Sequence, residues 1–397
     1  MENVSKRLAS LSPSATIAMN QKSQEMKLNG IDVVNLSVGE PDFPTPDNVK
    51  AAAKKAIDDN FSFYAPVPGY PELRKAIVSK FKRENDLDYT VDQIVVSTGA
   101  KHSIANVLLC IIDPGDEVIV PSPYWVSYPE QVKIAEGVNV IIDAGIESEY
   151  KITPEQLEDA IGPKTKALML CSPSNPSGSL YSREELSALV DVLKKHPSVF
   201  VISDEIYEHI NFSGKHVSIA EFPEVFDRTI VVNGVSKGYA MTGWRIGYIG
   251  APLWIAKACA KLQGQMTSGA TSISQKAAVE ALNGDQSCIA EMKAAFIRRR
   301  DYVLGRMEKI EGINCTVPDG AFYVFPDMSA YFGKSNGEHT INGSMDLCLY
   351  LLEIGRIATV PGAAFGTPNN VRISYATSDD NLVKAMDRLE KALGELK

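Results

Sequence analysis

The sequence predicts an α/β protein with a doubly wound, mostly parallel sheet in a large domain and a smaller α+β domain beside it. Between about residues 93 and 232, short β-branched runs alternate with helical segments. After about residue 290 this alternation ends, and a long charged segment leads into shorter apolar ones. At 397 residues the chain is long enough for one large domain with a smaller companion.

The amino-terminal part is predicted to form two helices separated by a loop. The first helix is expected at 17–27, and the loop, rich in glycine and proline, at 36–46. Pro71 begins the second helix, because proline is favoured in a first helical turn. Leu73 and Ile77 then lie on one face of that helix.

The middle of the chain supplies the predicted parallel sheet. Its expected strands lie at 93–96, 117–120, 138–142, 167–170, 199–202 and 229–232, with helices at 102–112 and 184–195. Ligands of such sheets bind beyond the carboxyl ends of the strands. The residues that come after each strand are therefore the candidates for a functional site.

The domain division is predicted at residues 46 and 290. Residues 46–290 would form the large domain, and residues 1–45 would join 291–397 in the small one. The small domain is expected to contain a helix at 291–310, short apolar segments at 315–317 and 322–324, a helix at 345–353 and a strand at 371–374.

Composition and charge exclude several classes of protein. The net charge of -9 and the lack of a long basic cluster argue against nucleic-acid binding. No apolar run is long enough to span a membrane, and residues 1–20 lack the apolar core of a signal peptide. Six scattered cysteines without a Cys-x-x-Cys pattern predict reduced thiols in a cytoplasmic protein. Five histidines without ligand spacing predict no metal site.

The first strand end, Ser97 to Lys101, is a small-residue turn at the start of a helix. Such a turn presents free backbone N–H groups of Gly99, Ala100 and Lys101 to an anion. The same pattern also occurs as an ordinary turn between a strand and a helix.

Two further strand ends carry polar side chains. Asn175 follows the strand at 167–170 in an Asn-Pro turn, where its amide can donate to an oxygen. Asp204 and Tyr207 follow the strand at 199–202. A buried carboxylate needs a cationic partner, such as a protonated pyridine nitrogen, although a helix N-cap accounts for Asp204 equally well.

The segment 233–247 places Lys237 in a small-residue turn and Arg245 eight residues later. A lysine that must lose its proton needs a dry site near other cations, and an arginine suits a phosphate dianion. On its own the segment could be a glycine-rich surface turn. Together, the four strand ends supply every group that a pyridoxal phosphate Schiff base requires.

With these residues, the chain resembles the class I aminotransferases of pyridoxal phosphate fold type I, and among them the gamma subgroup of aspartate aminotransferases. The resemblance runs from the motif at 38–43 through 318–323 to 372–375, and the attachment signature around Lys237 matches throughout. It implies a seven-stranded sheet, pyridoxal 5'-phosphate as the cofactor and an obligate homodimer.

The resemblance also implies roles for single residues around the cofactor ring. Lys237 would form the covalent link to the cofactor and move the substrate proton. Asp204 would pair with the ring nitrogen, while Tyr207 and Asn175 would bind the ring oxygen. Trp125 would stack on the ring.

Further roles concern the phosphate and the substrate. The phosphate would be held by Arg245, Ser236 and the backbone of 99–101. Tyr64 would reach the phosphate bound by the partner subunit. Arg372 would bind the substrate α-carboxylate beside the backbone of Gly39.

Two departures from the relatives bear on specificity. The enteric-type aspartate enzymes have an arginine for the distal carboxylate in the segment that corresponds to 261–267, and this chain has none there. Lys101 is therefore expected to meet that carboxylate, as in the gamma subgroup. In some relatives a phosphate-binding serine stands three residues before the lysine, where this chain has Gly234, and this departure weakens the assignment of Ser236.

The expected function is transfer of an amino group from aspartate to 2-oxoglutarate by a ping-pong cycle, with amino acids and 2-oxo acids as substrates. Alternatives on the same scaffold are prephenate, aromatic or alanine aminotransferases and a pyridoxal phosphate β-lyase. A cofactor-binding transcriptional regulator is disfavoured, because residues 1–30 leave no room for a DNA-binding module and the chain is acidic.

Overall fold

A computed structural model describes residues 4–397, so residues 1–3 of the amino-terminal lead lie outside the described part. Its centre is a seven-stranded sheet in the order β2-β8-β7-β6-β5-β3-β4. The strands are β2 (Ile94–Ser97), β3 (Glu117–Ser122), β4 (Val138–Asp143), β5 (Thr165–Cys171), β6 (Phe200–Asp204), β7 (Thr229–Gly234) and β8 (Gly247–Gly250). All six strands predicted from the sequence are present, and the sheet is mostly parallel, as predicted.

Strand β8 was not among the predicted strands, and it runs antiparallel to both of its neighbours, β2 and β7. It begins at Gly247, where a Cβ would lie 2.1 Å from the backbone nitrogen of Ala100. This glycine is needed for close packing against the start of the helix that begins at Ala100. In the sequence, the same glycine is typical of a turn.

Helices cover both faces of the sheet because alternate side chains of each strand point to opposite faces. Val95 and Val232 pack with α5 (Ala100–Ile111), α6 (Ser127–Ile134) and α10 (Leu253–Met266). Their neighbours Val96 and Val231 pack with α4 (Pro71–Asn85) and α11 (Ser272–Asn283). On this second face, α7 (Pro154–Ala160), α8 (Arg183–Leu193) and α9 (Pro223–Phe226) cover the other half of the sheet.

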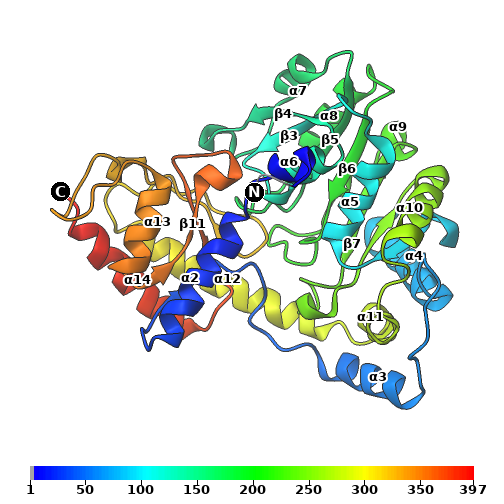
Figure 1. Cartoon of the computed structure of the whole chain (residues 1–397), viewed down its shortest axis with the longest axis horizontal. Coiled ribbons are helices and arrows are strands. Elements are labelled where there is room, and N and C mark those ends of the chain that lie inside the picture. Colours follow the sequence, from blue (N-terminus) through cyan, green and yellow to red (C-terminus); the bar gives the residue numbers. More distant parts are fainter. Residues whose placement is uncertain (1–3) are drawn as a thin grey trace.

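The carboxyl-terminal part shares one apolar core with the amino-terminal segment. Its helices are α12 (Ser287–Met307), α13 (Ser344–Glu353) and α14 (Asp379–Gly394), and α2 (Ala15–Leu28) lies among them in Figure 1. Strand β12 (Val371–Ser374) lies between β11 (Val360–Pro361) and β9 (Tyr323–Val324), and β1 (Val34–Asn35) pairs with β10 (Ile357–Ala358). The predicted division at 46 and 290 stays a prediction.

The amino-terminal part contains two further helices, and one short segment that was expected to be apolar and regular forms no strand. Two helices of the amino-terminal part are α1 (Lys6–Ala9) and α3 (Asp47–Asp58), the latter beside α11 in Figure 1. The apolar segment 315–317 forms no strand, and only Asn314 makes an isolated bridge to Asp327. No helix within residues 4–397 is long and apolar enough to cross a membrane.

Candidate active site

A cavity of about 240 Å³ lies at the carboxyl ends of β5, β6 and β7 and at the start of α5. Its walls also include residues of α6, of the segment before α3 and of β12. Eleven of the residues singled out from the sequence line it: Gly39, Ala100, Lys101, Trp125, Asn175, Asp204, Tyr207, Ser236, Lys237, Arg245 and Arg372. The cavity therefore lies at the edge of the sheet at which ligands of such sheets are expected to bind.

Lys237 extends its ammonium group across the cavity and donates a hydrogen bond to the carbonyl oxygen of Gly39. Burial lowers the pKa of Lys237 to about 8, and the guanidinium groups of Arg372 and Arg245 act in the same direction. The amine is therefore far easier to deprotonate than a lysine in water. A nucleophile or a proton carrier needs this property.

Asp204 ends β6 and is buried at the bottom of the cavity. Burial raises its pKa to about 6. Two hydrogen bonds to its carboxylate, from the Tyr128 hydroxyl (2.6 Å) and the Ile206 N–H (3.2 Å), lower the pKa and offset part of this effect. The segment after it forms turns and not a helix, so Asp204 is not a helix N-cap. A buried carboxylate of this kind suits a cationic partner.

Arg372 is 1% exposed, although none of its nitrogens meets a carboxylate among residues 4–397. Two of its nitrogens donate to the Asn175 side-chain oxygen (2.9 Å) and the Ser37 carbonyl (2.6 Å), and Nε has no partner in the described part of the chain. The guanidinium also lies 4.5 Å from the centre of the Tyr323 ring. A buried cation with an unused donor calls for an anionic ligand.

The contact with Arg372 also orients Asn175. Because its amide oxygen accepts from the arginine, the NH₂ end of the side chain is left to donate to a ligand. Tyr207 contributes a second polar group, whose hydroxyl shares a 2.8 Å hydrogen bond with the hydroxyl of Tyr323.

The start of α5 and the guanidinium of Arg245 form a second anion-binding feature. Gly99 precedes the helix with a φ of +83°, and no side chain caps the helix there. A Cβ on Gly99 would lie 2.4 Å from a nitrogen of Arg245, so a side chain there would displace the guanidinium. The N–H groups of Ala100 and Lys101 have no acceptor within the described chain, and Ser236 lies in the same wall.

Lys101 is exposed at the mouth of the cavity, where its ammonium lies 4.8 Å from the centre of the Trp125 ring. Partial desolvation lowers its pKa, and the charge of Arg245 lowers it further. The segment 261–267, which lacks the distal arginine, comprises the last turns of α10 and Thr267, and none of its residues lines this cavity.

Four cations and one carboxylate thus line the cavity, the cations being Lys101, Lys237, Arg245 and Arg372. None of the four forms an ion pair with an acidic side chain of residues 4–397. The nearby Glu40 offsets part of the charge at Lys237. The arrangement fits a ligand with a phosphate and at least one carboxylate.

Two predicted residues do not line the cavity. Gly99 lies behind its wall and acts by making room for Arg245. Tyr64 lies outside it and is 98% exposed, next to Phe63 at 80%. Within a single chain, nothing brings Tyr64 to the site.

The structure adds lining residues that sequence reasoning missed. They are Ser14, Thr16, Ile17, Val126, Ser127, Tyr128, Cys171, Ile206, Thr242 and Tyr323. Tyr323 belongs to the motif at 318–323 that the chain shares with the aminotransferases, so the sequence did contain a signal for this residue. Ser14, Thr16 and Ile17 lie at the start of an exposed helix and offered none.

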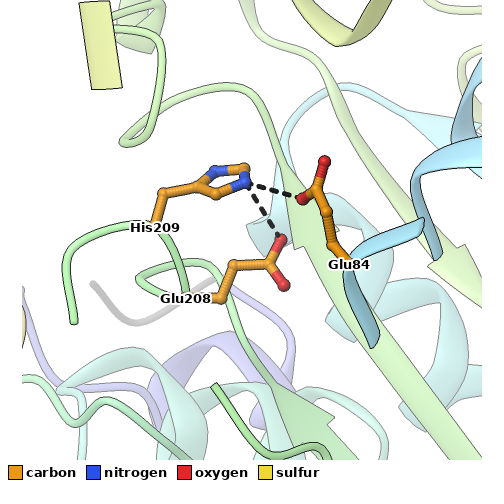
Figure 2. A group of neighbouring side chains, drawn as sticks. All are labelled: Glu84, Glu208 and His209. Carbon is orange, nitrogen blue, oxygen red and sulfur yellow. Dashed lines mark hydrogen bonds and ion pairs between the residues drawn. The ribbon is translucent and has the colours of Figure 1, made fainter. Parts of the chain in front are cut away.

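Behind the cavity, a buried network holds the segment after β6 in place. Figure 2 shows the His209 ring directed at the carboxylates of Glu84 and Glu208, with Nε2 at 2.9 and 3.8 Å. Lys80, which is 0% exposed, forms an ion pair with Glu208, and the Asn233 amide donates to that carboxylate at 2.7 Å. Asn233 lies close to Lys237 in sequence, so the network joins the two segments that carry catalytic candidates.

The network also bears on the predicted absence of a metal site. Glu84, Glu208 and His209 lie close enough to share an ion, and so do Glu205, Glu208 and His216. The spacing of histidines along the chain could not reveal these groups, because their members come from different segments. Lys80 already supplies a cation to Glu208, and although burial raises the pKa of Glu208, this ammonium lowers it to about 2.

The buried pair predicts a large stability effect for Glu208→Gln. Removing one partner of a buried ion pair leaves the other charge uncompensated, which costs about 3–5 kcal/mol of unfolding free energy. The measurement is equilibrium unfolding in urea. Glu84→Gln is the matched control, because it leaves the pair of Lys80 and Glu208 intact, and equal losses in both variants would contradict the prediction.

The chain belongs to the aminotransferase class I and II family, whose sequence model matches residues 31–389. It is therefore a transferase of amino groups, and the predicted fold type is confirmed by its structural neighbours. It is 50% identical over 394 residues to the probable aspartate/prephenate aminotransferase of Rhizobium leguminosarum bv. phaseoli, with 98% of each chain covered. It is 48% identical over 394 residues to the aspartate/prephenate aminotransferase of Nitrosomonas europaea, covering 98% of this chain and 99% of that one.

Solved structures with the same fold include two aspartate aminotransferases. The enzyme from Rhizobium meliloti matches with a TM-score of 0.96 and 45% identity, over 100% of both chains. The enzyme from Thermus thermophilus with maleate matches with a TM-score of 0.93 and 41% identity, over 99% of this chain and 100% of that one.

Proposed function

We propose that this chain is an aspartate:2-oxoglutarate aminotransferase that uses pyridoxal 5'-phosphate. The observation that carries the proposal is the cavity lined by one buried carboxylate and four cations, none of which forms an ion pair within residues 4–397. A neutral substrate would leave these cations without partners, whereas a phosphorylated cofactor and a dicarboxylic substrate supply three anionic groups. The names of the relatives support the same substrate class.

The residues present fit the cofactor. Arg245, Ser236 and the free N–H groups at the start of α5 would hold the phosphate. Asp204 would keep a proton on the ring nitrogen, and Asn175 and Tyr207 would donate to the ring oxygen. When bound, pyridoxal phosphate supplies the aldehyde that takes up the amino group and a ring that accepts electrons from the substrate α-carbon.

Lys237 would both attach the cofactor and carry the proton of the reaction. Its pKa of about 8 gives a substantial neutral fraction near pH 7.5, so the amine can accept a proton from the α-carbon. Its ammonium form already reaches the Gly39 carbonyl, which lies on the segment that forms one wall of the cavity.

The substrate would be held at both ends. Arg372, oriented by Asn175 and Ser37, would bind the α-carboxylate, and Lys101 would bind the distal carboxylate at the cavity mouth. The Thermus thermophilus enzyme was solved with maleate, which is a dicarboxylate, and this supports a dicarboxylic substrate.

Lys101→Ala should lower kcat/KM for aspartate and glutamate by about 10- to 100-fold, the range of a hydrogen bond to a charged group. The value for alanine should change little, since alanine has no distal carboxylate. The ratio of kcat/KM for aspartate to that for alanine measures the effect. Equal losses for both substrates would remove the role of Lys101 in specificity.

Initial rates test the proposed function directly. One purified sample is assayed with aspartate, glutamate and alanine as donors and with 2-oxoglutarate and prephenate as acceptors. The proposal requires aspartate with 2-oxoglutarate to be a fast pair and alanine to be slow. Prephenate is the second candidate substrate, because relatives at 50% and 48% identity carry it in their names, and it too is a dicarboxylate. Faster turnover of alanine than of aspartate would contradict the proposal.

A homodimer forms part of the proposal. Tyr64 and Phe63 are largely exposed in the single chain, which is unusual for adjacent aromatic side chains. We assign Tyr64 to the phosphate site of a second copy, as the resemblance implies. We also place the enzyme in the cytoplasm, where its six cysteines, all free thiols, would stay reduced.

A further inference from the structure

Tyr128 lines the cavity and has no role in the proposed reaction as described above. It lies in the first turn of α6, is 2% exposed, and its hydroxyl donates to Oδ2 of Asp204 at 2.6 Å. The indole of Trp125 packs edge-on against its ring, with centroids 5.4 Å apart and an interplanar angle of 83°. The phenol is therefore held in one orientation toward the carboxylate.

The surroundings of Asp204 do little else to keep it ionised. Cys171 faces it from the end of β5, Lys237 from the segment after β7, and Glu205 from its own strand end. Burial and the charge of Glu205 favour the protonated acid, and Lys237 opposes them weakly. The two oxygens have one donor each within residues 4–397, namely the Ile206 N–H on Oδ1 and the Tyr128 hydroxyl on Oδ2.

A tyrosine is well suited to this position. Burial and the charge of Asp204 raise the pKa of the Tyr128 hydroxyl well above its usual value, so it stays a donor at every pH at which the enzyme works. Its hydrogen bond favours the ionised carboxylate over the acid. A protonated Asp204 could not pair with a protonated ring nitrogen.

We propose that Tyr128 is a positioning residue that keeps the Asp204 carboxylate ionised and directed into the cavity. The proposal rests on the proposed function, because it assigns Asp204 to the cofactor ring. It predicts that loss of the phenolic hydroxyl makes Asp204 a weaker acid before any cofactor binds.

The test is Tyr128→Phe, studied in the full-length protein with and without pyridoxal phosphate. In the cofactor-free protein, ¹³C NMR of labelled aspartate carboxyls follows the titration of Asp204. Its signal is identified as the one that is missing from the spectrum of Asp204→Asn. The pKa should rise by about one to two units, the range for a hydrogen bond to a charged group. Equilibrium dialysis measures the pH below which the affinity for pyridoxal phosphate falls. This pH should rise by the same amount.

Tyr181→Phe is the matched control. Tyr181 is also buried, at 5% exposed, and its hydroxyl accepts a hydrogen bond from the Ile152 N–H, without contact with Asp204. This variant loses the same atom and should leave the Asp204 titration unchanged. Incorporating 3-fluorotyrosine at position 128, a stronger donor of nearly the same shape, should lower the pKa of Asp204 and keeps the test available if Tyr128→Phe does not fold.

The outcomes separate this inference from the proposed function. A wild-type chain that binds no pyridoxal phosphate would refute the proposed function, whatever the titration gives. A wild-type chain that binds it, together with an unchanged Asp204 titration in Tyr128→Phe and in the fluorinated protein, would overturn the role of Tyr128 alone.

Discussion

Replacing Lys237 with alanine is expected to abolish turnover and the visible absorbance of the bound cofactor together. Lys101 and Lys237 are the two lysines that line the cavity within residues 4–397, and of these Lys101 is exposed. The lowered pKa of Lys237, about 8, fits a group that takes and returns a proton. Proton transfer of this kind contributes about 10²- to 10⁴-fold, so kcat should fall by at least about 100-fold. Steady-state rates with aspartate and an absorption spectrum measure both effects.

The control for this variant is Lys257→Ala on α10, which removes an exposed lysine outside the cavity. It should keep the rate and spectrum of the wild-type protein. A Lys237→Ala protein that remains yellow and active would refute the assignment of the attachment lysine.

Arg372→Ala is expected to lower kcat/KM for every amino acid substrate by roughly 30- to 5,000-fold, the range for truncating one partner of a buried charge pair. The loss should be the same for aspartate and alanine, because both carry the α-carboxylate. This pattern distinguishes Arg372 from Lys101, whose removal should affect dicarboxylates alone. Comparing kcat/KM for the two substrates in the two variants provides the measurement.

A stability measurement accompanies the Arg372 variant. Without a carboxylate partner among residues 4–397, the buried guanidinium bears an unfavourable desolvation cost, so an apolar replacement should not lower the melting temperature. Arg372→Met should therefore lose activity. In the absence of ligand, its melting temperature should equal or exceed that of the wild-type protein. Unfolding of this variant at a much lower temperature would show that the arginine is structural.

The sheet, and the edge at which the cavity lies, could be predicted from the sequence because buried parallel strands leave a strong pattern of β-branched residues. The groups at the strand ends, Asn175, Asp204 and Lys237, were predicted for the same reason. Strand β8 was not predicted because glycines occupy its first and last positions and leave only a short apolar run between them.

Other residues of the site could not be predicted from local patterns. Tyr128 has the sequence surroundings of an ordinary core aromatic, and its role depends on the fold bringing α6 next to the end of β6. The network of Lys80, Glu208 and Asn233 likewise joins segments about 25 to 150 residues apart. Such contacts arise from topology and leave no signal in the spacing of residues.

The excess of cations in the cavity has a consequence for the lifetime of the protein. Positive groups that repel one another weaken the folded state, and anions that bind only the folded chain restore it. A ligand at 100 times its Kd adds about 2.7 kcal/mol of stability by mass action. The supply of cofactor and dicarboxylic acids would then set not only the rate of catalysis but also how long each molecule resists unfolding and proteolysis.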